Sequence, residues 1–383
     1  MTLAELLENE ALRQSEFPVT RVGTFLAHAG VCALPRRVME AMRQHVEGCG
    51  EGDQEAGLPA GFFGRTRELA ARLLGAAAGE IALVGPTSLA LSYVAAGLPW
   101  ERGDNLVVYF DDYPSNVYPW LALRRRGVQV RCVRAPALGQ LEPAEVLAEV
   151  DARTRLVALA SCHFVSGWRL DHQTLGRALR ERNVLFCLDA IQTLGAFPTT
   201  VEYVDFLAAD AHKWLLGPCG AGILYVRAAL QERLAPAVYG WHNVRCPNFT
   251  TQEEIVFQPD ARRYEAGTAN LVGLAGLQAG LELVLEVGVE VIATELRRKR
   301  AWLVSALTAK GCVVWHGACP EANASGIVAF HRPTEDTTCL HARLTAAGVV
   351  TSLRADRTGQ SYIRLSPHFY NTDDELQRVL RAL

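Results

Sequence analysis

Two residues near the middle of the chain have the types and the spacing for Schiff-base chemistry. Lys213 follows an apolar run at 205–210 and precedes a glycine-rich turn, which predicts that its amine lies at the end of a buried strand. Asp189 ends another apolar run, at 184–190, and open α/β sheets hold ligand groups at the carboxyl ends of their strands. A lysine amine withdrawn from water has a lowered pKa and can attack a carbonyl carbon. The sequence therefore predicts an amine and a carboxylate at one edge of a sheet.

A third stretch, "VGPTS", supplies a candidate anion site. Thr87 and Ser88 follow a strand-like run and open a predicted helix, where backbone N–H groups, two hydroxyls and the helix dipole favour a negative charge. The structural alternatives are that Asp189 only joins an ion pair and that one hydroxyl only caps the helix. Together, the three stretches match what pyridoxal 5′-phosphate requires: an amine for its aldehyde, a carboxylate for its ring nitrogen and an anchor for its phosphate.

These groups need a sheet to position them, and short apolar runs predict one. The runs lie at 80–84, 105–110, 128–133, 155–160, 184–190, 205–210 and 221–226. Near-continuous hydrophobic strands joined by helical stretches indicate a mainly parallel sheet that is buried on both faces. We therefore predict an α/β fold with a seven-stranded, mainly parallel sheet between layers of helices.

Beyond about residue 270 the pattern changes to that of a smaller α+β unit. Two long helical patterns cover 271–287 and 289–310, and a last helix is predicted from Thr372. Short strands are predicted near 312–316, 325–330 and 361–365. The predicted division is an N-terminal segment at 1–20, a large cofactor-binding domain at 21–275 and a small C-terminal domain at 276–383.

Composition restricts the class of protein. The chain has 383 residues, half of them hydrophobic, and a net charge of −3 with scattered basic residues, which argues against a nucleic-acid partner. It has no apolar run of about 18 residues and no apolar leader, so we expect no membrane partner and a cytoplasmic location. Ten cysteines without a CxxC pair indicate neither a metal site nor a disulfide framework. A small-molecule enzyme is the expected class.

From about residue 20 to its end, the sequence resembles the class V aminotransferase group of fold-type I pyridoxal-phosphate enzymes. This group includes cysteine desulfurases, isopenicillin-N-epimerase-like proteins and kynureninase. The resemblance is carried by "LDAIQTLG", "AHKWLLGPCGAGILYVR", "YEAGTANLVGLAGL" and "IRLSPHFYNTDDEL". It implies that Lys213 binds the cofactor aldehyde and later shuttles a proton, and that Asp189 pairs with the pyridinium nitrogen.

The resemblance also implies further contacts to the cofactor. Gln192 would face the phenolic oxygen of the ring. The phosphate would be held by Thr87, Ser88 and His212. Gly267 and Thr268 match a Gly-Thr pair that reaches the phosphate across a dimer interface, which implies a homodimer with shared active sites.

Two cofactor contacts depart from the cysteine desulfurase pattern. Desulfurases stack a histidine on the cofactor, whereas "DDYPSNVYPW" is similar to the kynureninase-like pattern, with Tyr113 as the stacking ring and Asn116 as a polar contact. The alternative is that Tyr113 is a core residue. Asp210 stands where desulfurases have a serine, and a third carboxylate near the phosphate needs a compensating partner.

The candidate substrate contacts are mostly arginines and histidines. Arg364 matches the family's arginine for a substrate α-carboxylate, and its alternative is a surface salt bridge. His28 belongs to a segment that folds over the substrate mouth, and His163 to a segment that runs past the cofactor; each could contact substrate or only stabilise a loop. Arg354 and Arg357 could select an acidic side chain or could be solvated.

The type of reaction is open at this point. Desulfurases carry a nucleophilic cysteine on the loop before the carboxylate-binding arginine, but here that loop reads "VVTSLRADRTGQSY". Cys319 is the nearest substitute, and free cysteines ordinarily pack. After removal of the α-proton, the resemblance allows amino transfer, β-elimination or epimerisation. We expect an aminotransferase-like enzyme for a small L-amino acid, with a β-eliminating or C–S-cleaving lyase as the alternative.

Two other functional classes agree less well with the sequence. A nucleotide-binding dehydrogenase could be argued from "GPCGAG" at 217–222, but these glycines enter a strand rather than a helix, so the dinucleotide fingerprint fails. A non-catalytic cofactor-binding module would be expected to lack the lysine or to carry a DNA-binding segment, and the sequence shows neither feature.

Overall fold

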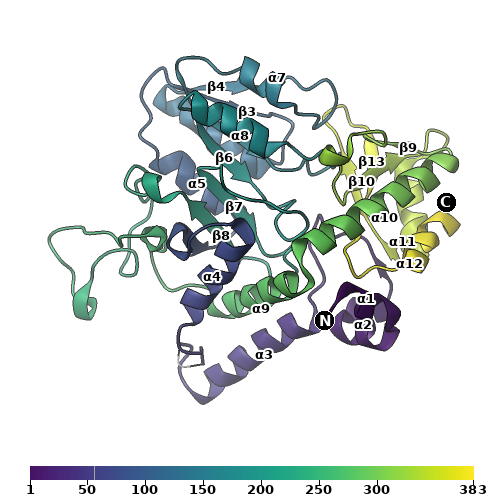
Figure 1. Ribbon diagram of the computed structural model, residues 1–383, viewed down its shortest axis with the longest axis horizontal. Helices are drawn as coiled ribbons and strands as arrows, with labels where there is room; N and C mark the ends of the chain where they lie inside the picture. Colours follow the sequence, from purple (N-terminus) through teal and green to yellow (C-terminus); the bar gives the residue numbers. More distant parts are fainter. Residues whose placement is uncertain (56) are drawn as a thin grey trace.

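The computed structural model describes residues 1–55 and 57–383. A seven-stranded sheet with helices on both faces forms the larger part, and a four-stranded sheet with its own helices forms the smaller part (Figure 1). Helix α10 runs from the first part to the second, and the helices α1 and α2 lie beside the smaller part (Figure 1). The predicted α/β class is confirmed.

The large sheet contains all seven predicted strands, in the order β2-β8-β7-β6-β5-β3-β4. Their bounds are β2 (Ile81–Val84), β3 (Asn105–Val108), β4 (Gln129–Cys132), β5 (Thr154–Ala160), β6 (Leu185–Asp189), β7 (Phe206–Asp210) and β8 (Gly222–Val226). Strands β3 to β7 pair in parallel, whereas β8 is antiparallel to both β7 and β2. The sheet is therefore mainly parallel, as predicted.

The orientation of β8 follows from the short connection that precedes it. A parallel neighbour needs a crossover of about a dozen residues or more, usually a helix, whereas an antiparallel strand can follow a compact turn. The chain between β7 and β8 forms no helix and returns directly to the sheet. At Gly222 a Cβ atom would lie 2.6 Å from the carbonyl oxygen of Ala209, so glycine is required where β8 starts beside β7. This compact connection contains Lys213.

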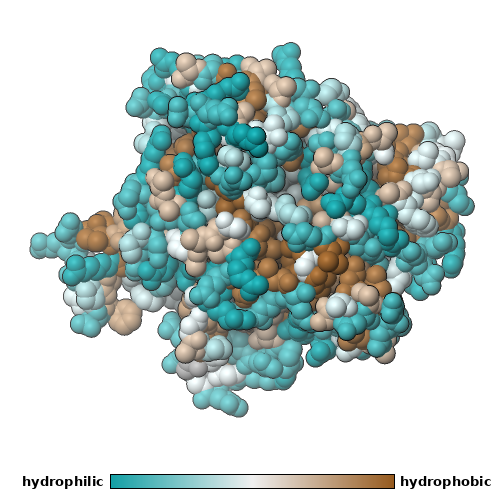
Figure 2. Space-filling model, in the orientation of Figure 1, coloured by the Kyte–Doolittle hydropathy of each residue, from teal (hydrophilic) through white to brown (hydrophobic). Residues whose placement is uncertain are grey.

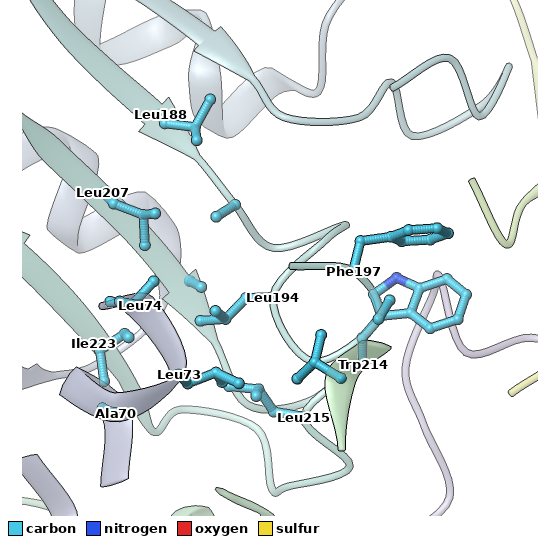
Figure 3. Close-up of a cluster of buried hydrophobic side chains, with 14 of the residues drawn as sticks. Ala70, Leu73, Leu74, Leu188, Leu194, Phe197, Leu207, Trp214, Leu215 and Ile223 are labelled. Atoms are coloured by element: carbon cyan, nitrogen blue, oxygen red, sulfur yellow. The ribbon is translucent and has the colours of Figure 1, made fainter. Parts of the chain in front are cut away.

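Both faces of the sheet are buried, which explains the near-continuous apolar runs. On one face Leu207 and Ile223 pack with Leu74 of α4, and Trp214 lies in the same cluster (Figure 3). On the other face alternate residues, such as Leu224, pack with α5. Helices on both sides of the sheet thus bury its apolar side chains, in one core cluster on each face.

The helices of the chain differ in length and position. They are α1 (Leu3–Glu8), α2 (Glu10–Glu16), α3 (Arg36–Glu51), α4 (Phe62–Leu74), α5 (Thr87–Gly97), α6 (Tyr118–Ala122), α7 (Pro143–Ala148), α8 (His172–Glu181), α9 (Leu271–Val287), α10 (Val289–Ala309), α11 (Thr337–Ala346) and α12 (Asp373–Arg381). The two long helical patterns predicted after residue 270 are α9 and α10, and Thr372 caps α12. In the described part of the chain no single helix could span a membrane by length and composition; only α9 and α10 together pass that test, bent by 77°.

The small sheet has the order β12-β13-β10-β9, with all neighbours antiparallel. Its strands are β9 (Val313–Val314), β10 (Val328–His331), β12 (Ser352–Ala355) and β13 (Ser361–Leu365). The edge strand β12 was not predicted, because its residues are half polar. A separate pair joins β1 (Thr24–Phe25) in parallel to β11 (Val349–Val350), so the N-terminal part of the chain packs on the C-terminal part.

Lysine is rare in this chain, and two of its lysines are buried. The three lysines are Lys213, Lys299 and Lys310, and the first two are buried. The Nζ of Lys299 donates to Glu295 Oε1 at 2.8 Å and to the carbonyl oxygens of residues 368 and 369 at 3.2 and 2.7 Å. Burial lowers the pKa of Lys299 to about 8. This amine joins α10 to the segment that follows β13.

We expect Lys299→Met to lower the free energy of unfolding by about 3 kcal/mol, because it leaves the carbonyl oxygens of residues 368 and 369 without this buried donor and leaves Glu295 with only the half-exposed Arg298. The matched control is Arg298→Ala, since Arg298 also pairs with Glu295 but is half exposed; its cost should stay below about 1 kcal/mol. Urea unfolding of both variants measures the difference. Equal losses in the two variants would contradict this role of Lys299.

Candidate active site

A pocket of about 270 Å³ lies where the carboxyl ends of β6 and β7 face the small sheet. Residues from the large sheet, the small sheet and the N-terminal segment all line it. Nine of the predicted site residues are among them: Thr87, Ser88, Tyr113, Asp189, Gln192, Asp210, His212, Lys213 and Arg364. The fold thus brings together groups that are up to 277 positions apart in the sequence, counted from Thr87 to Arg364.

Lys213 is held in the compact connection between β7 and β8 with its side chain 7% exposed. The three residues after it, Trp214 to Leu216, are buried in the main core cluster and fix the backbone. Loss of hydration lowers the pKa of Lys213 to about 8; Asp189 opposes this shift, and Arg364 adds to it. A sizeable fraction of the amine is therefore uncharged at mildly alkaline pH.

Two other parts of the chain contact this connection through backbone atoms. The amide of Cys32 donates to the carbonyl oxygen of His212 at 2.7 Å. His368 Nε2 donates to the carbonyl oxygen of Trp214 at 3.2 Å. The N-terminal segment and the segment after β13 therefore both hold the turn that carries Lys213.

Asp189 is a buried carboxylate at the end of β6. It accepts one hydrogen bond, at 3.1 Å, from the amide of Ile191. Burial raises its pKa to about 6, and Lys213 opposes the shift. A buried carboxylate with one amide donor can take a second, charged N–H partner, as a pyridinium ring would supply.

Sequence reasoning missed a second buried carboxyl group, Asp112. It accepts hydrogen bonds from the amides of Tyr113 and Ala160 and from Asn116 Nδ2, at 2.7 to 3.1 Å. Burial and the charge of Asp189 raise its pKa to about 7. The predicted contact Asn116 does not line the pocket, because its amide holds Asp112 and accepts from Trp120 Nε1. The signal was the pair of aspartates before Tyr113.

Tyr113 and Gln192 flank the lysine. The centroid of the Tyr113 ring lies 5.5 Å from Lys213 Nζ, and the ring packs edge-on against Phe164. Tyr113 is exposed on the pocket wall rather than buried in the core. The amide of Gln192 is fixed, since Oε1 accepts from Trp214 Nε1 at 3.0 Å and Nε2 donates to the carbonyl oxygen of Ala29 at 3.1 Å. One N–H of Gln192 is left for a ligand.

The opposite end of the pocket is suited to an anion. Helix α5 starts at Thr87 without a side-chain cap, so its first N–H groups face the pocket end unpaired by side chains. Thr87 Oγ1 is buried and has no hydrogen-bond partner, and Ser88 Oγ lies 2.7 Å from Ser115 Oγ. The capping alternative for these hydroxyls is therefore wrong. This orphaned hydroxyl, beside a helix N-terminus, fits a phosphate.

Asp210 has the partner that the sequence left unidentified. Its Oδ2 lies 3.0 Å from Nδ1 of His212, and its Oδ1 accepts from the amide of Ala211 at 2.9 Å. This is a close charge contact rather than a hydrogen bond, since Nδ1 of His212 has no hydrogen-bond partner among the described residues, and the imidazole lines the pocket beside it. The third carboxylate thus acts on the anion end through a histidine.

Arg364 is the strongest candidate for a substrate contact. It is 1% exposed, donates to the carbonyl oxygen of Phe164 at 2.6 Å and to Ser352 Oγ at 3.3 Å, and has no partner for Nε. No carboxylate of the described residues lies within ion-pair distance of it. Burial lowers its pKa to about 9. The surface salt-bridge alternative is therefore wrong, and the guanidinium is available for a carboxylate ligand.

The two histidines predicted to contact substrate, His28 and His163, do not line the pocket. His28 is fully buried, with Nδ1 donating to the carbonyl oxygen of Ser366 and Nε2 accepting from the hydroxyl of Tyr370. His163 accepts from Ser166 and donates to a backbone carbonyl oxygen. Burial lowers the pKa of each to about 4. Their chain neighbours, Ala29 and Phe164, face the pocket instead.

Gly267 and Thr268 lie outside this pocket. They line a separate surface depression with Trp241 and His242, where residues 241–257, the segment that projects at the left of Figure 1, begin. Their contact with the phosphate of a second subunit stays a prediction.

Taken together, the pocket fits pyridoxal 5′-phosphate. The orphaned Thr87 hydroxyl and the start of α5 match its phosphate, Asp189 matches its ring nitrogen, and Lys213 matches its aldehyde. The family model described as "Aminotransferase class-V" matches residues 24–379.

Curated relatives are similar over nearly the whole chain. A "Probable cysteine desulfurase" of Methanothermobacter thermautotrophicus is 29% identical over 388 residues, which covers 96% of each chain. An "Uncharacterized aminotransferase YcbU" of Bacillus subtilis is 29% identical over 371 residues, covering 95% of this chain and 94% of that protein.

Solved structures have the same fold. A cysteine desulfurase of Thermococcus onnurineus superposes with a TM-score of 0.87 at 22% identity, covering 96% of this chain and 95% of that one. The cystine C–S lyase C-DES, in a complex with its product cysteine persulfide, superposes with a TM-score of 0.84 at 21% identity, covering 95% and 98%.

Proposed function

Because the chain belongs to the class-V aminotransferase family, whose cofactor is pyridoxal 5′-phosphate, we propose that it transfers the amino group of a small L-amino acid. The observation that carries this proposal is the arrangement of Arg364 and Lys213. A buried guanidinium without a counter-ion and a partly neutral amine line one pocket of about 270 Å³. The first can bind the α-carboxylate while the second works at the α-carbon.

Bound in the pocket, the cofactor would supply an aldehyde for the substrate amine and a ring that takes up electrons. Lys213 is the group that would accept the α-proton and return it, because its pKa of about 8 suits both tasks near neutral pH. Asp189 would hold a proton on the ring nitrogen, and Arg364 would fix the substrate carboxylate. Tyr113 and Phe164 would limit the access of water from the open side.

The second candidate is a β-eliminating or C–S-cleaving lyase. Relatives named cysteine desulfurase favour it. However, none of the described residues that line this pocket is a cysteine, and Cys319 lines a different depression beside Arg300. A lyase that releases sulfur on a small product, as the name of C-DES states for that protein, would not need an enzyme thiol.

We also propose a homodimer with shared sites. The segment that projects at the left of Figures 1 and 2 carries exposed aromatic and aliphatic side chains, among them Trp241, Phe249 and Ile255. A second subunit could cover these side chains and bring its Gly267 and Thr268 to the anion end. The cytoplasmic location stays a prediction from the sequence.

A panel of amino acids tests the choice between the two reactions. The holoenzyme is mixed with L-alanine, L-aspartate, L-serine, L-cysteine or L-cystine, with and without an acceptor keto acid. Amino transfer predicts that repeated turnover to a keto acid requires the acceptor, that at most one equivalent of keto acid per active site forms without it, and that no ammonia or sulfide is released. Ammonia, sulfide, or pyruvate well above one equivalent per active site, formed without an acceptor, would replace our proposal by the lyase.

A further inference from the structure

A second arginine of the pocket is not used by the proposed reaction. Arg354 lies on the edge strand β12 and lines the pocket together with Arg364 and Lys213. Its side chain is part-buried, and Nη1 donates to the carbonyl oxygen of its own neighbour Leu353 at 2.9 Å. No carboxylate of the described residues forms an ion pair with it.

The register of the small sheet places the two arginines on one face. Ser352 of β12 is paired with Arg364 of β13, and Arg354 is two residues further along β12. Because side chains alternate along a strand, Arg354 projects from the same face as Ser352 and Arg364. Diagonal neighbours of this kind have backbones about 7 to 8 Å apart, within reach of long side chains.

The loop between β12 and β13 contains a third arginine, which serves as a contrast. Arg357 forms an ion pair with Asp111, and its guanidinium lies over the ring of Phe110 at 4.4 Å from the centroid. It does not line the pocket. The structure therefore separates two residues that the sequence left equivalent, since Arg357 has a carboxylate partner and Arg354 does not.

Two positive charges on one sheet face repel each other, and an anion between or beside them offsets that repulsion. Arg354 and Arg364 each lower the pKa of Lys213, with Arg364 having the larger effect, as expected for the arginine that is deeper in the pocket. The phosphate site proposed above uses other groups, the hydroxyls of Thr87 and Ser88 and the start of α5, so it does not account for Arg354.

We propose that Arg354 binds a second anionic group, at the end of the substrate side chain, so that the preferred substrates are dicarboxylic L-amino acids. This inference rests on the proposed function for its amino-acid substrate. Arg364 would hold the α-carboxylate deep in the pocket, and Arg354 would hold the distal carboxylate nearer to the mouth. Two guanidiniums on one sheet face match two carboxylates separated by a short aliphatic chain.

Equilibrium binding tests this inference without turnover. Glutarate and succinate carry two carboxylates and no amine, and butyrate carries one carboxylate, so calorimetric titration of the holoenzyme compares them without chemistry. We expect the dicarboxylates to bind at least 10-fold more tightly than butyrate to the wild-type protein. We expect Arg354→Gln to reduce that preference by roughly 10- to 100-fold, the range for a hydrogen bond to a charged group. The matched control, Arg357→Gln, should keep the preference.

A second measurement links the result to substrate. The cofactor absorbance is titrated with L-glutamate, L-aspartate and L-2-aminobutyrate, and the ratio of their dissociation constants is compared between Arg354→Gln and Arg357→Gln. Equal binding of mono- and dicarboxylates by the wild type would overturn the proposal. An equal loss of both in Arg354→Gln would also overturn it, because both arginines would then hold one carboxylate. A dicarboxylate preference without any response to amino acids would leave this site intact and refute the proposed function instead.

Discussion

Lys213→Ala should lose covalent attachment of pyridoxal 5′-phosphate and roughly 10⁴-fold of kcat, the upper range for a positioned acid–base group. The variant removes both the amine that binds the aldehyde and the proton acceptor. The fold should survive, because Trp214 and the residues after it, rather than the lysine side chain, fill the core. Alanine also relieves the burial of an amine, so the free energy of unfolding of the cofactor-free protein should not fall.

Borohydride reduction followed by peptide mapping measures the attachment. The label can be assigned without ambiguity, because the chain has only three lysine side chains, Lys213, Lys299 and Lys310. Lys299 is fully buried away from the pocket, and Lys310 serves as the matched control through Lys310→Arg. Label that persists in Lys213→Ala, or label found at Lys310, would exclude Lys213 as the attachment point.

The same chemistry gives a pH dependence. The neutral amine is the nucleophile, and burial lowers the pKa of Lys213 from 10.5 to about 8. The rate at which the cofactor-free protein captures added pyridoxal 5′-phosphate should therefore rise with pH and level off above about pH 8. Between this pKa and 10.5 the unfolded chain binds the extra proton, so this group adds to folding stability as the pH rises through that window.

Arg364→Gln should reduce kcat/KM for amino acids by roughly 10³-fold, because it removes a charge-assisted, two-pronged contact in a buried site. Most of the loss should appear in KM, since the substrate carboxylate is bound throughout the reaction. Arg364→Lys keeps the positive charge but cannot form two parallel hydrogen bonds to a carboxylate, so we expect it to recover only part of the lost kcat/KM. Steady-state kinetics with one amino acid and a fixed acceptor measure both variants.

Stability distinguishes loss of binding from misfolding in these variants. Arg364 is a buried charge without a counter-ion, so replacing it by glutamine should leave the melting temperature of the substrate-free protein unchanged or raise it. A drop in melting temperature together with an unchanged KM would show that Arg364 supports the fold rather than the substrate.

The large sheet could be predicted because most of its strands are buried on both faces and read as apolar runs; the edge strand β4 is the exception, with no fully buried residue. Strand β12 could not be predicted, because it is an edge strand in which Leu353 packs on the small core whereas Ser352 and Arg354 are polar and lie on the face of Arg364. The antiparallel β8 depends on the absence of a helix before Gly222, which apolar runs alone do not reveal. The type of each element could therefore be predicted from the local sequence pattern. The direction of β8 and the presence of the edge strand β12 depend on tertiary contacts, which the pattern does not contain.

The site was predictable where strand ends determine it, and not where loops do. Asp189 and Lys213 end or follow buried strands, so the sheet edge brings them together. His28 and His163 lie in irregular segments, and a rotation of one residue along the backbone places their neighbours in the pocket instead. No periodic pattern in the sequence indicates which of two neighbouring residues in an irregular segment faces the pocket. The burial of Asp112 could not be predicted for the same reason, although its neighbour Tyr113 was identified as a site residue.

The turn that carries Lys213 is held from one side by Cys32 and from the other by His368, of which the first precedes the lysine by 181 positions in the sequence and the second follows it by 155. During synthesis on the ribosome, the lysine is therefore translated and its sheet can form well before its final surroundings exist. Arg364 and His368 are translated 151 and 155 positions after Lys213, counted along the sequence. Stable capture of the cofactor is consequently expected only after these residues have been made and have packed against the turn.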